Sequence, residues 1–196
     1  MGALTLSTRI TLVRIALIPV LVLFLDLGRE RGGMLVAAAV VFVVAALTDF
    51  LDGYLARRWQ QVTDLGNFLD TTADKLLVTG ALVGLLPLGR TNAWVAFIII
   101  ARELAVLGLR AIAAGAAVVV SASFWGKSKF IVQVVGITVA ILRPPLEIGP
   151  LWLDEWLMIV VTVVTALSAI DYFSRFGALI GAGGVPPEPE EEEQPR

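Results

Sequence analysis

Residues 49–74 read DFLDGYLARRWQQVTDLGNFLDTTAD, and four aspartates in this stretch interrupt segments that are otherwise apolar: Asp49, Asp52, Asp70 and Asp74. A carboxylate at membrane depth is costly unless it is neutralised or faces a wet cavity, so it predicts a functional site. No comparable group of basic residues lies beside these aspartates in the sequence. We therefore interpret them as ligands of divalent cations rather than as a structural network of paired charges.

The spacing of these residues predicts two helices with one polar face each. Counted from Asp49, positions 52, 53, 56 and 57 have offsets that share one helix face, and positions 66, 70 and 74 recur every four residues on a second helix. The short polar segment 59–64 predicts a tight turn, so the two helices should be antiparallel neighbours whose aspartates converge. Ligands with oxygen donors only favour Mg²⁺, Mn²⁺ or Ca²⁺ over zinc and copper.

The composition is that of an integral membrane protein. The chain has 196 residues, of which 58% are hydrophobic, and a mean hydropathy of +0.87. It contains no cysteine and no histidine, which excludes disulfides, thiolate chemistry and a histidine base. The apolar stretch that begins near Ile10 is expected to be a retained first helix rather than a cleaved signal peptide.

Six apolar segments each approach the ~20 residues that a bilayer-spanning helix needs. They predict an all-α bundle of six transmembrane helices at approximately 10–27, 34–56, 65–86, 94–114, 130–142 with extensions, and 151–173. The distribution of Lys and Arg between the two sides places both termini, and the turn between the aspartate-bearing helices, in the cytoplasm. We expect a membrane domain over residues 1–182 and a disordered acidic tail over 183–196.

The pattern at 49–74 resembles the CDP-alcohol phosphotransferase motif, D-x2-D-G-x2-A-R-x8-G-x3-D-x3-D, at all eight defining positions. Further segments are similar to bacterial phosphatidylglycerophosphate synthases within this family: ITLVR at 10–14, FLDTTADKLL at 68–77, ARE at 101–103 and WGKSK at 125–129. The resemblance thus covers residues 10 to about 142. One departure is Thr71, where the family pattern leads us to expect proline.

The resemblance implies a phosphatidyltransferase that joins CDP-diacylglycerol to an alcohol and releases CMP. For this subgroup the acceptor would be glycerol 3-phosphate and the product phosphatidylglycerophosphate. It further implies a homodimer in the bacterial plasma membrane and two divalent cations, Mg²⁺ or Mn²⁺, with no nucleic-acid partner. The cations would be held by Asp49, Asp52, Asp70 and Asp74, and Asp74 would also act as the general base.

The remaining motif positions are suited to binding the CDP-diacylglycerol. Gly53 and Ala56 share the helix face of the first two aspartates, and Gly66 would give similar clearance on the facing helix. Arg57 is suited to a bidentate phosphate contact. Close packing of small residues between helices is an alternative reading of the glycines and the alanine.

A phosphorylated acceptor requires a second basic site, for which the candidates are Arg110, Lys127 and Lys129, with Arg102 and Arg14 behind them. The two lysines could instead be interfacial residues that reach toward the head groups. Glu103 should pair with an arginine, since a lone buried carboxylate is costly. Lys75 directly follows Asp74, so it should point about 100° away from it.

Other functions remain open from the sequence. The same chemistry with phosphatidylglycerol as acceptor would give a cardiolipin synthase, and with inositol phosphate a phosphatidylinositol phosphate synthase. A cation transporter could also carry intramembrane carboxylates. Against transport, the aspartates gather at one end of two adjacent helices, and no inverted repeat is visible.

Overall fold

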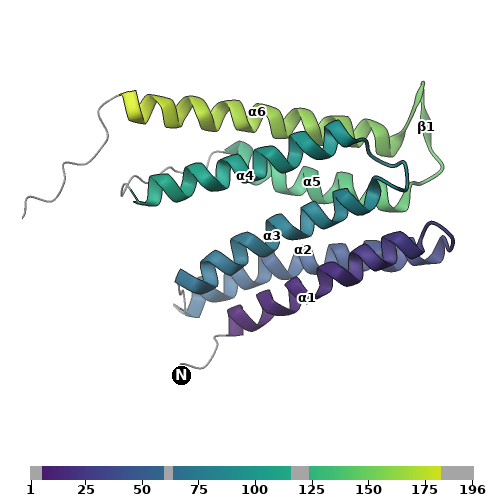
Figure 1. The fold of residues 1–196 in the computed structure, drawn as a ribbon, viewed down its shortest axis with the longest axis horizontal. Helices are drawn as coiled ribbons and strands as arrows, with labels where there is room; N and C mark the ends of the chain where they lie inside the picture. Colours follow the sequence, from purple (N-terminus) through teal and green to yellow (C-terminus); the bar gives the residue numbers. More distant parts are fainter. Residues whose placement is uncertain (1–5, 60–63, 116–123, 182–196) are drawn as a thin grey trace, which may run out of the picture.

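The structure is a computed structural model that describes the backbone of residues 6–59, 64–115 and 124–181, and the side chains of 8–48, 66, 68–112 and 129–174. It contains six long helices and one short hairpin (Figure 1). The elements are α1 (Leu6–Leu27), α2 (Gly33–Trp59), α3 (Asp64–Leu85), α4 (Ala93–Gly115), α5 (Phe124–Leu142), β1 (Glu147–Ile148), β2 (Leu151–Trp152) and α6 (Leu153–Gly181).

The six predicted helices are therefore present in the described residues, and most are longer than predicted. The helix predicted at 130–142 with extensions begins at Phe124, so the segment GKSK at 126–129 lies inside α5. The hairpin was not predicted: residues 143–150 were expected to be a simple connection. Its two strands pair antiparallel, Glu147 with Trp152 and Ile148 with Leu151, around Gly149, whose φ of 67° favours glycine.

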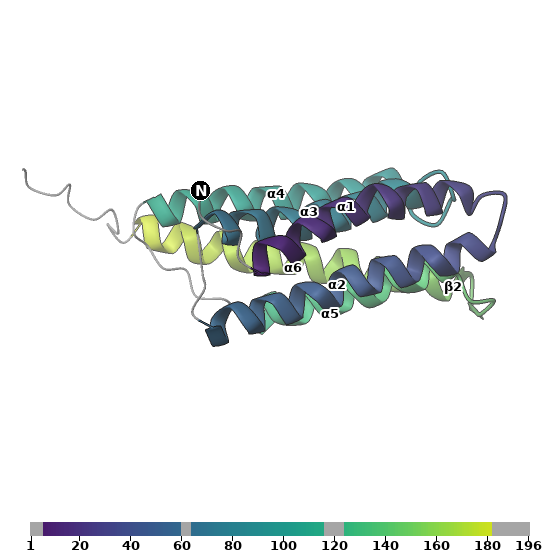
Figure 2. The same cartoon turned by 90° about the horizontal axis from the view of Figure 1, so that it is seen from below.

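The helices form two groups of three that lie against each other. In the first group, α1 packs on both α2 and α3; in the second, α6 packs on both α4 and α5. Contacts between α2 and α5, and between α3 and α4, join the two groups (Figures 1 and 2). Because α2, α4 and α6 end where α1, α3 and α5 begin, residues 49–59, 64–74 and 124–129 lie toward one end of the bundle.

Small residues allow the helices within each group to approach closely. A Cβ atom added at Gly84 of α3 would lie 2.5 Å from Leu25 Cδ1 of α1, and one added at Gly136 of α5 would lie 2.4 Å from Val161 Cγ2 of α6. These distances are too short for a Cβ atom unless Leu25 or Val161 shifts, so glycine allows the observed close packing. Most side chains of the buried core are alanine, leucine or isoleucine.

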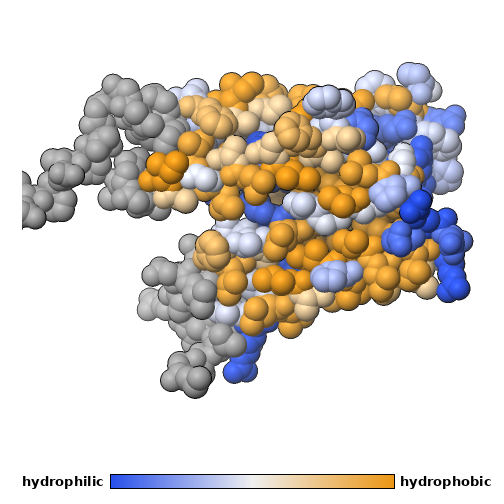
Figure 3. Space-filling model, viewed as in Figure 1, coloured by the Kyte–Doolittle hydropathy of each residue, from blue (hydrophilic) through white to orange (hydrophobic). Residues whose placement is uncertain are grey.

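The outer surface is strongly apolar, as expected of a protein that contacts lipid. Large hydrophobic side chains are exposed along every helix, and most of the face in Figure 3 is hydrophobic, with polar residues at one end and at the seam between the two groups. Within the part of the chain that the structure describes, two helical segments, Thr8–Leu27 and Leu153–Ser174, are long and apolar enough to cross a membrane. Together these features identify an all-α membrane protein.

Candidate active site

Asp70 and Asp74 lie one turn apart on α3, and their side chains share the face that the four-residue spacing predicts. They are partly exposed, at 31% and 19% of the side-chain surface. Gly66 lies one turn before Asp70 on the same helix. Both carboxylates are thus placed where a ligand from solvent can reach them, on a helix that is anchored by its packing against α1.

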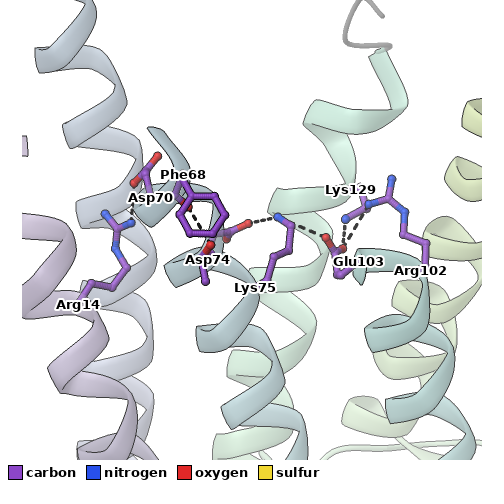
Figure 4. A network of polar contacts seen from close by, with 9 residues as sticks. Arg14, Phe68, Asp70, Asp74, Lys75, Arg102, Glu103 and Lys129 are labelled. Carbon is purple, nitrogen blue, oxygen red and sulfur yellow. Dashed lines mark hydrogen bonds and ion pairs between the residues drawn. The ribbon is translucent and has the colours of Figure 1, made fainter. Parts of the chain in front are cut away.

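Asp70 forms an ion pair with Arg14 of α1. Arg14 Nη1 lies 3.0 Å from Asp70 Oδ1, and the Arg14 side chain is 1% exposed (Figure 4). We expected Arg14 to lie behind the acceptor residues; packing of α1 on α3 places its guanidinium against Asp70. An arginine inside an apolar helix signalled a buried partner, but its identity depended on which helix packs against α1.

Lys75 contacts Asp74, although it was predicted to point away from it. Lys75 Nζ donates to Asp74 Oδ2 and also lies 3.3 Å from Glu103 Oε2 of α4. The 100° offset holds for the Cα–Cβ bond, but the four-carbon side chain is long enough to bring the ammonium group back to the neighbouring carboxylate. Lys75 therefore bridges two carboxylates on different helices.

Glu103 is the centre of a larger group of charges. Its side chain is 5% exposed, and three cations surround it: Lys75 of α3, Arg102 of α4 with Nη1 3.3 Å from Oε1, and Lys129 of α5, which donates to the same oxygen. Arg102 Nη2 also donates to Ser168 Oγ of α6 at 2.7 Å. The prediction that Glu103 pairs with an arginine is confirmed. The two lysines that contact Glu103, and Ser168 as a partner of Arg102, were not indicated by the sequence.

These side chains form one row across the bundle. Figure 4 shows Arg14, Asp70, Asp74, Lys75, Glu103, Lys129 and Arg102 in that order. The row begins on α1, crosses α3 and the seam, and ends among α4, α5 and α6. Among the described side chains of this row, four cations face three carboxylates, which leaves one excess positive charge. An excess of positive charge suits an anionic ligand.

The acceptor candidates are not all in the same surroundings. Lys129 is buried in the row, whereas Arg110 is exposed and its Cζ lies 5.9 Å from the centre of the Tyr172 ring of α6. Arg110 follows Arg102 by eight residues on α4, about two helix turns nearer the end of the bundle. Lys127 is part of α5, but its side chain lies outside the described residues.

Of the four predicted metal ligands, the structure describes the side chains of Asp70 and Asp74. Asp49 and Asp52 belong to α2, but their side chains lie outside the described residues. The same holds for Gly53, Ala56 and Arg57. Two accessible carboxylates one turn apart offer the oxygen donors that Mg²⁺ and Mn²⁺ prefer. Among the described side chains, no group of three potential metal ligands gathers.

Comparison with known proteins identifies the family of this chain. The profile described as CDP-alcohol phosphatidyltransferase matches residues 4–167. The CDP-diacylglycerol–glycerol-3-phosphate 3-phosphatidyltransferase of Bacillus subtilis is 38% identical over 181 residues, which cover 87% of this chain and 94% of that protein. The probable phosphatidylglycerophosphate synthase of Mycobacterium tuberculosis H37Rv is 38% identical over 183 residues, covering 92% and 84%. The protein of Rickettsia bellii with the same name as the Bacillus enzyme is 35% identical over 173 residues, covering 88% and 94%. The chain therefore belongs to the CDP-alcohol phosphatidyltransferase family.

Proposed function

We propose that this protein is a membrane phosphatidyltransferase that transfers the phosphatidyl group of CDP-diacylglycerol to glycerol 3-phosphate, forming phosphatidylglycerophosphate and releasing CMP. The observation that carries this proposal is the pair Asp70 and Asp74 beside a group of three cations around Glu103. The aspartates suit a metal-dependent transfer, and the excess of positive charge suits an acceptor that itself carries a phosphate. The names of the relatives in Bacillus and Rickettsia describe the same reaction.

The metal site would be made by Asp49 and Asp52 of α2 together with Asp70 and Asp74 of α3. When bound, two divalent cations would neutralise charge on the pyrophosphate and on the departing CMP. Asp74 is the proposed general base: it takes the proton from the acceptor hydroxyl. That oxygen forms a bond to the lipid-side phosphorus while the bond from this phosphorus to the bridging oxygen breaks, and CMP leaves with the bridging oxygen.

The donor site is assigned to the motif residues around these carboxylates. Gly53, Ala56 and Gly66 would let the CDP moiety approach the helix backbones, and Arg57 would contact a phosphate. The acceptor phosphate is assigned to Lys129, Lys127 and Arg110. Lys129 lies next to Glu103, so an incoming phosphate can take over one of its hydrogen bonds without leaving Glu103 uncompensated, because Lys75 and Arg102 remain.

The proposed arrangement in the membrane has six spans, with the active site and both termini on the cytoplasmic side of a bacterial plasma membrane, and a homodimer as the assembly. The shortest helix, α5, has 19 residues and a length of about 28 Å, close to the thickness of the hydrocarbon core. The division into a membrane domain at 1–182 and a tail at 183–196 is part of the same proposal, and the tail lies outside the described residues.

The test is CMP release by purified protein in detergent with CDP-diacylglycerol and either Mg²⁺ or Mn²⁺. Glycerol 3-phosphate, phosphatidylglycerol and inositol phosphate are offered separately. Release with glycerol 3-phosphate alone supports the proposal. Release with one of the other two acceptors would retain the aspartate chemistry but refute the acceptor, and no release with any of them would refute the enzyme function.

A further inference from the structure

Lys75 occupies an unusual place between two carboxylates that have different surroundings. On one side it donates to Oδ2 of Asp74, which is partly exposed; on the other it lies 3.3 Å from Oε2 of Glu103, which is buried. The Lys75 side chain itself is 23% exposed. Two opposite charges on different helices restrict its ammonium group more than one would.

Glu103 uses its two oxygens for different partners. Oε2 faces Lys75, while Oε1 accepts from Lys129 and Arg102. The one carboxylate therefore connects a lysine that holds Asp74 with a lysine assigned to the acceptor phosphate. Figure 4 shows this path from α3 through α4 to α5.

Helix association alone does not account for this network. Each charge loses hydration on burial, and replacement of buried ion pairs by apolar residues of similar volume is often neutral or stabilising. Apolar packing already joins the two groups of helices through α2 and α5. Charge-assisted hydrogen bonds, in contrast, fix the orientation of a carboxylate. A general base needs such fixing, because its oxygen must be placed to within about 0.5 Å of the productive position.

We propose that Lys75 and Glu103 are positioning residues that join the general base to the acceptor site. Lys75 directs the Asp74 carboxylate, and Glu103 holds Lys75 and Lys129 at a constant separation. The proposal rests on the proposed function, because it takes Asp74 as the base and Lys129 as a contact of the acceptor phosphate. It adds two residues that act through the groups they hold, Lys75 through Asp74 and Glu103 through Lys75 and Lys129.

The test compares Lys75→Met, Glu103→Gln, the double variant and Lys75→Arg in the CMP-release assay with varied glycerol 3-phosphate. We expect Lys75→Met to lower kcat at least about tenfold, with KM for CDP-diacylglycerol within about twofold. Lys75→Arg keeps the charge and should retain clearly more kcat than Lys75→Met. Glu103→Gln should also raise KM for glycerol 3-phosphate several-fold, because Lys129 and Arg102 lose their shared partner.

The double variant separates one bridge from two independent roles. If Lys75 and Glu103 act through each other, the double variant has about the same kcat as the slower single variant; independent roles multiply. Arg29→Met is the matched control, since Arg29 is 53% exposed and pairs with the exposed Asp26 at the other end of the bundle. Thermal unfolding in detergent, with and without glycerol 3-phosphate, is measured for every variant.

Three results would overturn the bridge while leaving the proposed function intact. These are an unchanged kcat in Lys75→Met, effects that multiply in the double variant, and a loss of kcat that merely follows a loss of folded protein. Absence of CMP release from the unmodified protein with every acceptor would instead refute the proposed function, and the bridge with it.

Discussion

At the end of the bundle that carries the hairpin, Arg90 donates hydrogen bonds to the backbone carbonyls of Ala140, at 3.2 Å, and Ile141. Arg143 lies at the same end, with its Nε atom 3.8 Å from Oδ2 of Asp154 and its Nη2 atom 3.6 Å from Oε1 of Glu155. Toward the other end, Arg14 and Lys75 instead face Asp70 and Asp74, which are partly exposed.

The difference between the two ends lies in what the cations satisfy. Arg90 bonds to carbonyls that the end of α5 leaves without a helical partner, and Arg143 covers the start of α6 and stacks on Trp152, with Cζ 5.3 Å from the ring centre. These contacts complete secondary structure. At the candidate active site, cations pair with carboxylates that are partly exposed. Buried cations occur at both ends, so they do not by themselves indicate a functional site. The candidate site differs in having partly exposed carboxylates one helix turn apart.

The largest effect should come from removal of divalent cations. Dialysis against a chelator is expected to abolish CMP release, because the aspartates then lack the charges that hold the pyrophosphate, and added Mg²⁺ or Mn²⁺ should restore it. The contacts at the hairpin end involve protein groups alone, so the thermal unfolding temperature of the protein should change little on chelation. If turnover persists in the presence of the chelator, the proposal that the site holds metal ions is refuted.

Asp74→Asn should come next in size. The substitution keeps the shape of the side chain but removes its ability to take a proton, so turnover should fall by about 10²–10⁴-fold. Equilibrium binding of labelled CDP-diacylglycerol should remain measurable, which shows that the site is still formed. Substantial residual turnover would exclude Asp74 as the base.

Arg110→Ala should have a smaller and more selective effect. If Arg110 contacts the acceptor phosphate, the apparent KM for glycerol 3-phosphate should rise about tenfold, and more than that for CDP-diacylglycerol. Arg110→Lys keeps the charge and serves as the control. Equal effects on the two substrates would instead assign Arg110 to its stacking on Tyr172.

Arg90→Met should have the smallest effect on catalysis. It leaves carbonyls of α5 without a donor, which should lower the free energy of unfolding by about 1–3 kcal/mol, while kcat stays within about twofold of wild type. Unfolding in detergent and CMP release measure the two quantities. A fall in kcat as large as that in Asp74→Asn would show that the two ends are coupled and would end the distinction between them.

Much of the architecture followed from local pattern. The ~20-residue apolar segments predicted six helices, and all six are present because backbone hydrogen bonds within a helix need no distant partner. The two-residue strands were missed because their pairing is short and their apolar residues continue into α6. The four-residue spacing of Gly66, Asp70 and Asp74 correctly placed them on one helix.

The partners of these residues could not be predicted in the same way. Arg14 and Asp70 are 56 positions apart, and Glu103 and Lys129 are 26 apart, so each pair forms only because particular helices pack together. The reach of Lys75 was misjudged because a flexible side chain is directed by the charges around it rather than by its Cα–Cβ bond alone.

Residue types and their spacing were thus sufficient for the helices, for the polar face of α3 and for the resemblance to the family to which the chain belongs. These properties are local, because periodicity and hydropathy act within a single segment. The counter-charges of the aspartates, and the row that joins them to Glu103 and Lys129, depended on how six segments pack. Electrostatic partners are set by distance in space, which a linear sequence does not contain.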